Sequence, residues 1–397
     1  MPILNYDLID ALINITPEST LADARKERSN ATENTQAAFE AIFSAPSPQL
    51  TGEIKFLFAR IIAEQTGSHV LADFYNQLLG QRSPNLNTPA LQAAEHYLRI
   101  LVSQPKQTHY SLIHALIEQG WHEADIILLA QLITFVTYQA RLIEGLRLLQ
   151  GNSTITKSAE PVTAGQWNSN SHTHQGQPAP TAFTQDQLGW ESWLQARDPQ
   201  TLEADEAQVM KKFGQLNSEY FLLLAHQSHI LTLRTLIDRG VFYTLGGLPR
   251  WEREFAAAAV SKVNGCIYCA SVHARKASQY AKERKADVEK LIATPVGAIL
   301  AEGFDDRLTA ITDFTTALST TPIRATHQQV ETLRQLGLSE LELLDLIQST
   351  AFFSWANRLM LSLGEPFELK QDKEWSRDTA KRVKCFGRAN HSRPTKP

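Results

Sequence analysis

The sequence predicts an all-α protein, and three observations lead to that prediction. Apolar residues recur at intervals of three and four over long stretches, as in residues 52–79 and 90–104. Alternating runs of Val, Ile and Thr bounded by hairpin dipeptides are scarce. A stretch of the first half, residues 116–146, also aligns without a gap with residues 333–363. We therefore expect helices arranged in two related halves.

Composition limits the classes of function. The chain has 397 residues, of which 43% are apolar and 20% charged, as expected for a globular protein of two or three domains. Its net charge of −4 does not favour a nucleic acid as partner. The N-terminal sequence lacks a basic region, and apolar runs are too short or too polar to predict a membrane span. We expect a cytoplasmic protein.

The first half is expected to be one helical domain, residues 1–150, with three clear helices: 52–79, 90–104 and 123–149. Residues 151–182 are rich in Asn, Ser, Thr, Gln, Gly and Pro, so a flexible linker is predicted there. His172 and His174 within it are interpreted as solvated side chains rather than metal ligands.

The second half is expected to be another helical domain, residues 183–380. Trp190 and Trp193 near its start are predicted to pack on the helical core. Ser339 followed by Glu342 predicts a capping box for its last helix. The expected helices are 203–216, 218–238, 249–263, 266–283, 305–319, 324–336 and 340–362.

The chain ends in a basic tail, residues 381–397, which lacks apolar periodicity and is predicted to be mobile. Cys385 lies in this tail. We interpret it as an exposed, incidental thiol, because it is far in sequence from the other two cysteines.

Those two cysteines lie three residues apart and are followed by a histidine. If a helix begins after Gly265, then Cys266, Cys269 and His273 share one face. The first turn of a helix favours a thiolate, and a histidine one turn later can accept the thiol proton. In a reducing compartment such a pair is more typical of catalysis or metal binding than of a structural disulfide. The pattern therefore indicates a redox-active thiol pair.

A carboxylate belongs to the same expected site. Glu254 precedes Cys269 by too many residues to reach it along a single helix. The Asn264-Gly265 dipeptide predicts a break, after which two helices can pack side by side and bring Glu254 towards His273. The carboxylate would then orient the imidazole and stabilise its charged form, as in a triad of nucleophile, base and orienting group.

Two simpler interpretations of these residues stay open. A zinc ion could be held by Cys266, Cys269, His273 and a carboxylate, although structural zinc usually has four Cys or His ligands. Alternatively, both cysteines are buried structural residues, and the histidine beside them only makes hydrogen bonds within the core. No glycine loop for a cofactor is found, because Gly246-Gly247 precedes a helix instead of following a strand. No bound cofactor is predicted.

The pattern Glu-x11-Cys-Ile-Tyr-Cys-x3-His, within NGCIYCASVHA, resembles the redox motif of the alkylhydroperoxidase D-like branch of the carboxymuconolactone decarboxylase superfamily. The resemblance implies that Cys269 attacks a peroxide, that Cys266 resolves the product to a disulfide, and that His273 and Glu254 form a proton relay. Tyr268 stands where some members have a histidine. Which sulfur attacks, and whether a second base is needed, therefore stay open.

The internal repeat extends this resemblance to the first half. In the aligned stretches Gln131 meets Gln348 and Arg141 meets Arg358, matches that helical patterning alone does not produce. Aligning Gly67 with Gly265 replaces all four chemical groups: Phe56 stands at Glu254, Ser68 at Cys266, Leu71 at Cys269 and Tyr75 at His273. We expect two tandem alkylhydroperoxidase D-like domains, only the second with the redox motif. The resemblance also implies a homo-oligomer.

The resemblance implies a thiol-dependent hydroperoxide reductase, which takes a hydroperoxide as substrate and a dithiol, lipoyl or thioredoxin-like, as reductant. A lactone decarboxylase-like lyase would instead use His273 and Glu254 for proton transfer without sulfur chemistry. A third possibility is a thiol switch or zinc-bound helical module with no catalytic activity.

Overall fold

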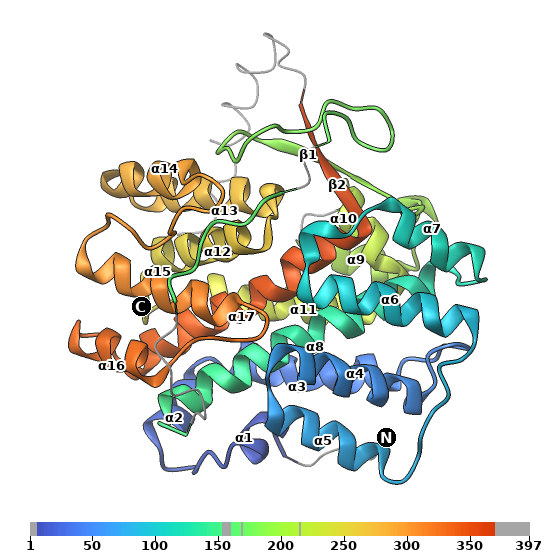
Figure 1. Ribbon diagram of the computed structural model, residues 1–397, viewed down its shortest axis with the longest axis horizontal. Helices are drawn as coiled ribbons and strands as arrows, with labels where there is room; N and C mark the ends of the chain where they lie inside the picture. Colours follow the sequence, from blue (N-terminus) through green and yellow to red (C-terminus); the bar gives the residue numbers. More distant parts are fainter. Residues whose placement is uncertain (1–5, 153–159, 168–169, 214–215, 370–397) are drawn as a thin grey trace, which may run out of the picture.

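The structure is a computed structural model that describes residues 6–152, 160–167, 170–213 and 216–369. It confirms the all-α prediction: helices make up most of this part of the chain (Figure 1). The described residues also contain one antiparallel sheet of two short strands, β1 (Leu188–Ser192) and β2 (Gly364–Glu368). The basic tail with Cys385 lies outside the described residues.

The described residues of the first half form eight α-helices and a 3-10 turn at Pro105–Gln107. The α-helices are α1 (Leu8–Leu12), α2 (Thr20–Glu27), α3 (Ser29–Ser44), α4 (Gly52–Thr66), α5 (His69–Leu79), α6 (Pro89–Ser103), α7 (Tyr110–Glu118) and α8 (Glu123–Leu149). The predicted helix over 52–79 is wrong in one respect, because Gly67 adopts a left-handed conformation (φ +82°) and separates α4 from α5.

The second half contains nine described α-helices. They are α9 (Ala204–Phe213), α10 (Glu219–Leu224), α11 (Ser228–Phe242), α12 (Arg250–Asn264), α13 (Ile267–Tyr280), α14 (Lys285–Ala293), α15 (Asp306–Ser319), α16 (His327–Gln335) and α17 (Glu340–Leu363). The expected helix 218–238 is divided by a 3-10 turn at Ala225–Gln227, and α14 was not predicted. The predicted capping box is present, with Ser339 and Glu342 each accepting from the other's backbone.

Helices α8 and α17 cross at the centre of the molecule (Figure 1). Gly145 of α8 permits a close approach, because a Cβ there would lie 2.6 Å from a methyl carbon of Ile347. The Trp355 indole donates to Oε1 of Gln131 at 2.9 Å across the same interface. Of the helices described, α8 is long and apolar enough to span a membrane, but its apolar stretch is completely buried by neighbouring helices. Its composition therefore reflects core packing.

The order of the helices repeats between the halves. The pairs are α3 and α11, α4 and α12, α5 and α13, α6 and α15, α7 and α16, and α8 and α17. Gly67 and Gly265 both adopt the left-handed backbone conformation. The residues that follow them, Ser68 and Cys266, have nearly the same φ and ψ as each other. Helix α14 is an insertion in the second half. The exact domain boundaries stay a prediction.

The matched arginines of the repeat hold the two halves together. The Arg141 guanidinium, on α8, donates to the Ser319 carbonyl at the end of α15 (3.0 Å). Arg358, on α17, donates to the carbonyls of Leu101 and Val102 at the end of α6 (3.1 and 2.9 Å). Each long helix thus supplies donors to the free carbonyls at the C-terminus of a helix in the other half.

The segment expected to be a linker makes specific contacts where the structure describes it. Residues 160–167 run across the second half (Figure 1), and backbone hydrogen bonds join Ala164 to Ala298 and Gly165 to Lys262, both at 2.9 Å. Val162 and Ala164 are buried. This part of the chain therefore packs as an element of the second half. His172 and His174 lie on the following loop, where the His174 ring stacks on Tyr110.

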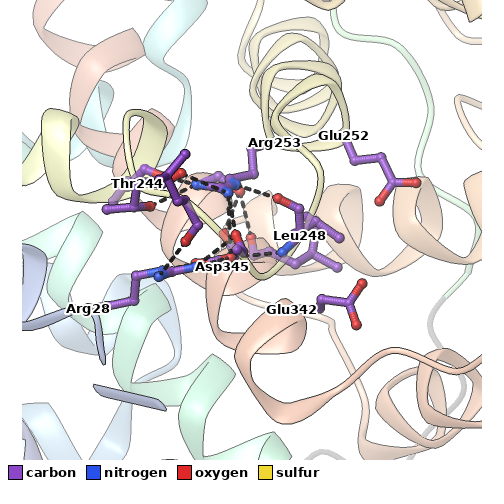
Figure 2. A network of polar contacts seen from close by, with 12 residues as sticks. Arg28, Thr244, Leu248, Glu252, Arg253, Glu342 and Asp345 are labelled. Carbon is purple, nitrogen blue, oxygen red and sulfur yellow. Dashed lines mark hydrogen bonds and ion pairs between the residues drawn. The ribbon is translucent and has the colours of Figure 1, made fainter. Parts of the chain in front are cut away.

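A buried ionic network anchors the loop between α11 and α12 (Figure 2). Asp345 of α17 accepts two hydrogen bonds from Arg28 (2.7 and 2.9 Å) and one from the backbone N–H of Leu248 (2.9 Å). Arg253 donates to carbonyls of the same loop, including that of Gly246 (2.9 Å). All three charged side chains are almost fully buried. The network therefore fixes the start of α12, the helix that carries Glu254.

Replacing Asp345 with Asn should destabilise the protein strongly, because it removes the buried counter-charge that Arg28 and Arg253 share. We expect a loss of about 3–5 kcal/mol in the free energy of unfolding, measured by denaturant titration. Glu95→Gln, which removes an exposed ion pair with Arg99, is the control and should cost less than about 1 kcal/mol. Equal small losses for both variants would contradict this assignment.

Candidate active site

The predicted site is built on a tight turn between α12 and α13. Helix α12 ends at Gly265, which has φ +74°, and a Cβ there would lie 2.5 Å from the Gln166 carbonyl oxygen. Only glycine fits this conformation and this space. The turn reverses the chain, so that α12 and α13 pack extensively against each other. Cys266 becomes the N-cap of α13, and Cys269 lies in its first turn.

Both cysteines are free thiols, buried with exposed fractions of 2% for Cys266 and 6% for Cys269. A hydrogen bond from the Cys266 thiol is the main cause that lowers the pKa of Cys269; burial opposes it, and Asn357 and the charge of Arg234 assist. Burial, and then the same bond, raise the pKa of Cys266. The geometry therefore favours a thiolate on Cys269 and a proton on Cys266.

Glu254 and His273 form a direct pair, with Nδ1 of His273 2.5 Å from Oε2 of Glu254. Burial alone would raise the pKa of Glu254, but the pull of His273, Lys276 and Arg250 outweighs it and lowers that pKa to about 2. Burial lowers the pKa of His273, against the opposing effect of Glu254. A neutral imidazole thus donates from Nδ1 to an ionised carboxylate. Its Nε2 is left as a base.

The structure brings the four predicted residues together as two contacting pairs. Cys266 contacts Cys269, and Glu254 contacts His273. Cys269 and His273 are one helical turn apart on the same face of α13. The hydrogen bonds that lower the pKa of Cys269 come from Cys266 and Asn357, not from the imidazole. The Cys269 thiol and the His273 imidazole are therefore neighbours on one helix face, and the hydrogen bonds that lower the pKa of the thiol come from other residues.

Sequence reasoning missed Asn357, a fully buried residue of α17. The Ser261 hydroxyl donates its hydrogen to the Ala257 carbonyl at 2.7 Å. The same hydroxyl oxygen therefore accepts a hydrogen bond from Nδ2 of Asn357 at 3.0 Å. Asn264 donates to Oδ1 of Asn357 at 3.0 Å. These two contacts fix the orientation of the amide and leave one N–H of Asn357 for the sulfur of Cys269.

Arg250 was also missed, although its spacing of four residues from Glu254 on one helix was a signal in the sequence. Its guanidinium donates twice to Oε1 of Glu254, at 3.0 and 2.9 Å. The rings of Tyr243 and Tyr280 flank it, with centroids 4.0 and 4.6 Å away. Arg250 therefore holds the carboxylate that orients His273.

A small cavity of about 40 Å³ adjoins Cys266, large enough for a water-sized molecule. Its walls are mostly apolar. They include Trp167, Pro180, Trp190, Met360 and Pro366. Part of this lining comes from the segment expected to be a linker, which therefore lies beside Cys266.

The described residues contain no group of three or more His, Cys, Asp or Glu side chains arranged to hold a metal ion. The contact of Nδ1 with Glu254 leaves Nε2 of His273 free, so this pair by itself is compatible with proton transfer and with metal ligation.

Fold and site together define an all-helical protein with a buried thiol pair at the start of one helix and a His–Glu pair beside it. Residues 230–312 match the carboxymuconolactone decarboxylase family. This segment runs from α11 into α15 and contains all four predicted site residues. A search of curated proteins found no matching relative.

Replacing Asn357 with Leu should raise the pKa of Cys269, because the thiolate loses a hydrogen-bond donor. A thiol is alkylated only as its thiolate, so the midpoint of the alkylation rate of Cys269 should move to higher pH, by about one to two units. The measurement is iodoacetamide labelling across pH with peptide mapping. Ser354→Ala, one turn earlier on α17, is the control. An unshifted midpoint for Asn357→Leu would remove Asn357 from the site.

Proposed function

We propose that this protein is a thiol-dependent hydroperoxide reductase. The observation that carries the proposal is the division of roles between two adjacent buried sulfurs. The environment of Cys269 favours its thiolate, whereas Cys266 keeps its proton and donates it in a hydrogen bond. An attacking thiolate and a resolving thiol are what a two-cysteine peroxidase needs.

In the first step, the Cys269 thiolate attacks the outer oxygen of a hydroperoxide. The O–O bond breaks, the sulfur becomes a sulfenic acid, and the other oxygen leaves with the electron pair. His273 takes the proton of the Cys269 thiol at Nε2 before the attack and gives it to the leaving oxygen, so that an alcohol departs. Glu254 stabilises the imidazolium in between.

In the second step, the Cys266 sulfur attacks the sulfenic sulfur of Cys269. An S–S bond forms, and the hydroxyl leaves as water with the Cys266 proton. The close approach of the two sulfurs supports this step. A dithiol reductant, lipoyl or thioredoxin-like, then restores both thiols by disulfide exchange.

We further propose that the chain is a tandem of two related domains, that only the second is redox-active, and that the protein is a cytoplasmic homo-oligomer. The repeated helix order supports the tandem. In the first half Ser68 donates to Glu144 at 2.7 Å, and Tyr75 donates to Gln139 at 2.6 Å. These buried polar pairs have a packing role, since no thiol stands beside them.

A lyase that uses His273 and Glu254 is the second candidate, favoured by the direct contact of these two residues. Such an enzyme would not need its sulfurs. The cysteine variants therefore separate the two functions.

Cys269→Ser should abolish hydroperoxide consumption, because it removes the attacking thiolate. Cys266→Ser should permit one turnover and then accumulate sulfenic acid on Cys269, since no resolving thiol remains. Both are measured by peroxide assay and by dimedone labelling with peptide mapping. Ser68→Ala, at the corresponding position of the first half, is the control and should turn over like the parent protein.

The reverse pattern, with sulfenic acid on Cys266 in Cys269→Ser, would exchange the roles of the two sulfurs. A protein whose peroxide consumption is insensitive to both variants would contradict the proposed function.

A further inference from the structure

One buried guanidinium in the described structure has no hydrogen-bond acceptor. Arg234 of α11 is 6% exposed, and its Nε is fully buried without a partner. It forms neither a hydrogen bond nor an ion pair within the described residues. The other buried arginines donate to carbonyls or carboxylates: Arg25, Arg28, Arg141, Arg253 and Arg358. A buried cation without a partner is costly, so Arg234 requires an explanation.

Two aromatic rings hold this side chain in place. The guanidinium carbon lies 5.1 Å from the ring centroid of Phe352 and 5.8 Å from that of Tyr220. Tyr220 in turn packs edge-on against Trp190, which lines the cavity beside Cys266. Cation–π contacts offset part of the cost of burial but supply no acceptor for the N–H groups. The N–H groups of the Arg234 guanidinium are therefore held in place but have no acceptor among the described residues.

The charge of Arg234 acts on the attacking thiol, since it contributes to the lowered pKa of Cys269. Asp238, one turn later on α11, forms no ion pair with Arg234 within hydrogen-bonding reach, but its charge interacts with Arg234 and, more weakly, with Lys276 and His273. Helix α11 therefore brings the charges of Arg234 and Asp238 close enough to act on Cys269 and His273 of α13.

A second unused group lies beside the first. The Tyr220 hydroxyl is buried and has no hydrogen-bond partner. Burial raises its pKa well above the ordinary value, so it stays a neutral O–H donor. Its charge interactions with Arg234, Cys269 and Cys266 place it in the same cluster. Buried polar groups nearly always have a hydrogen-bond partner. The guanidinium of Arg234 and the hydroxyl of Tyr220, both without one and near a reactive thiol, therefore indicate a site for a polar ligand.

We propose that Arg234 and Tyr220 bind the two oxygens of the hydroperoxide and that Arg234 stabilises the charge that develops on the leaving oxygen. The inference rests on the proposed function and assigns the substrate's reacting group to two further residues. As the Cys269 sulfur attacks, the O–O electron pair moves to the leaving oxygen, which accepts hydrogen bonds from the guanidinium. The proton still comes from His273, because a guanidinium does not give one up.

The test separates peroxide cleavage from thiolate formation. Reduced Arg234→Met, Tyr220→Phe and the parent protein are mixed with tert-butyl hydroperoxide in single-turnover stopped flow. Alkylation of Cys269 by iodoacetamide is followed in parallel, because it needs the thiolate but breaks no O–O bond. Arg239→Met, an exposed arginine of the same helix that also stacks on aromatic rings, is the control.

For Arg234→Met we expect the peroxide rate to fall about 100-fold or more and the alkylation rate to fall less than about tenfold. Tyr220→Phe keeps the ring and should lower the peroxide rate about tenfold with unchanged alkylation. Arg239→Met should change neither rate. Melting temperature should not fall in Arg234→Met, because the variant removes an unpaired buried charge.

Equal losses of the peroxide and alkylation rates in Arg234→Met would reduce Arg234 to a thiolate-stabilising charge and overturn the inference, as would an unchanged peroxide rate in both variants. The proposed function would then still stand, because the parent protein reacts. A parent protein that does not react with the hydroperoxide would instead overturn the function itself, and this inference with it.

Discussion

The site depends on one backbone constraint, the left-handed turn at Gly265. Because the Gln166 backbone lies against this residue, no side chain fits there, and the turn is confined to a single geometry. It ends α12, turns the chain back and makes Cys266 the N-cap of α13. Glu254 on one helix and His273 on the other are then opposed at hydrogen-bond distance. The same turn at Gly67 in the first half carries no thiol, so the turn is a property of the fold and the chemistry is an addition to it.

The groups around this turn differ in protonation state, and each state has a cause in the neighbouring side chains. Cys266 keeps the proton, and Cys269 is supported as an anion by Cys266 and Asn357. Glu254 stays ionised beside a neutral His273. The two arginines near the site differ in use: the half-buried Arg250 donates to Glu254, whereas the buried Arg234 has no acceptor among the described residues. Because Arg250 already has an acceptor and Arg234 does not, we infer that a substrate oxygen binds at Arg234.

Much of this arrangement could be predicted from sequence, because it depends on spacing along the chain. The break at Asn264-Gly265 and the helix over 123–149 follow from local patterns, and the structure has both. Asn357 and Arg234 could not be found in this way, since they reach the thiols through the packing of α17 and α11, far from the motif in sequence. The strands β1 and β2 were missed for the same reason. Their pairing joins distant segments, and neither has an alternating pattern of its own.

The central claim is that Cys266 and Cys269 form a redox pair. The most direct test is the intact mass and thiol count of the purified, reduced protein before and after one equivalent of hydroperoxide, under denaturing conditions. We predict the loss of two thiols and of about two hydrogen masses, mapped to a Cys266–Cys269 disulfide. Thiols that stay reduced, with the peroxide unconsumed, would contradict it and leave a helical protein whose cysteines serve only its packing.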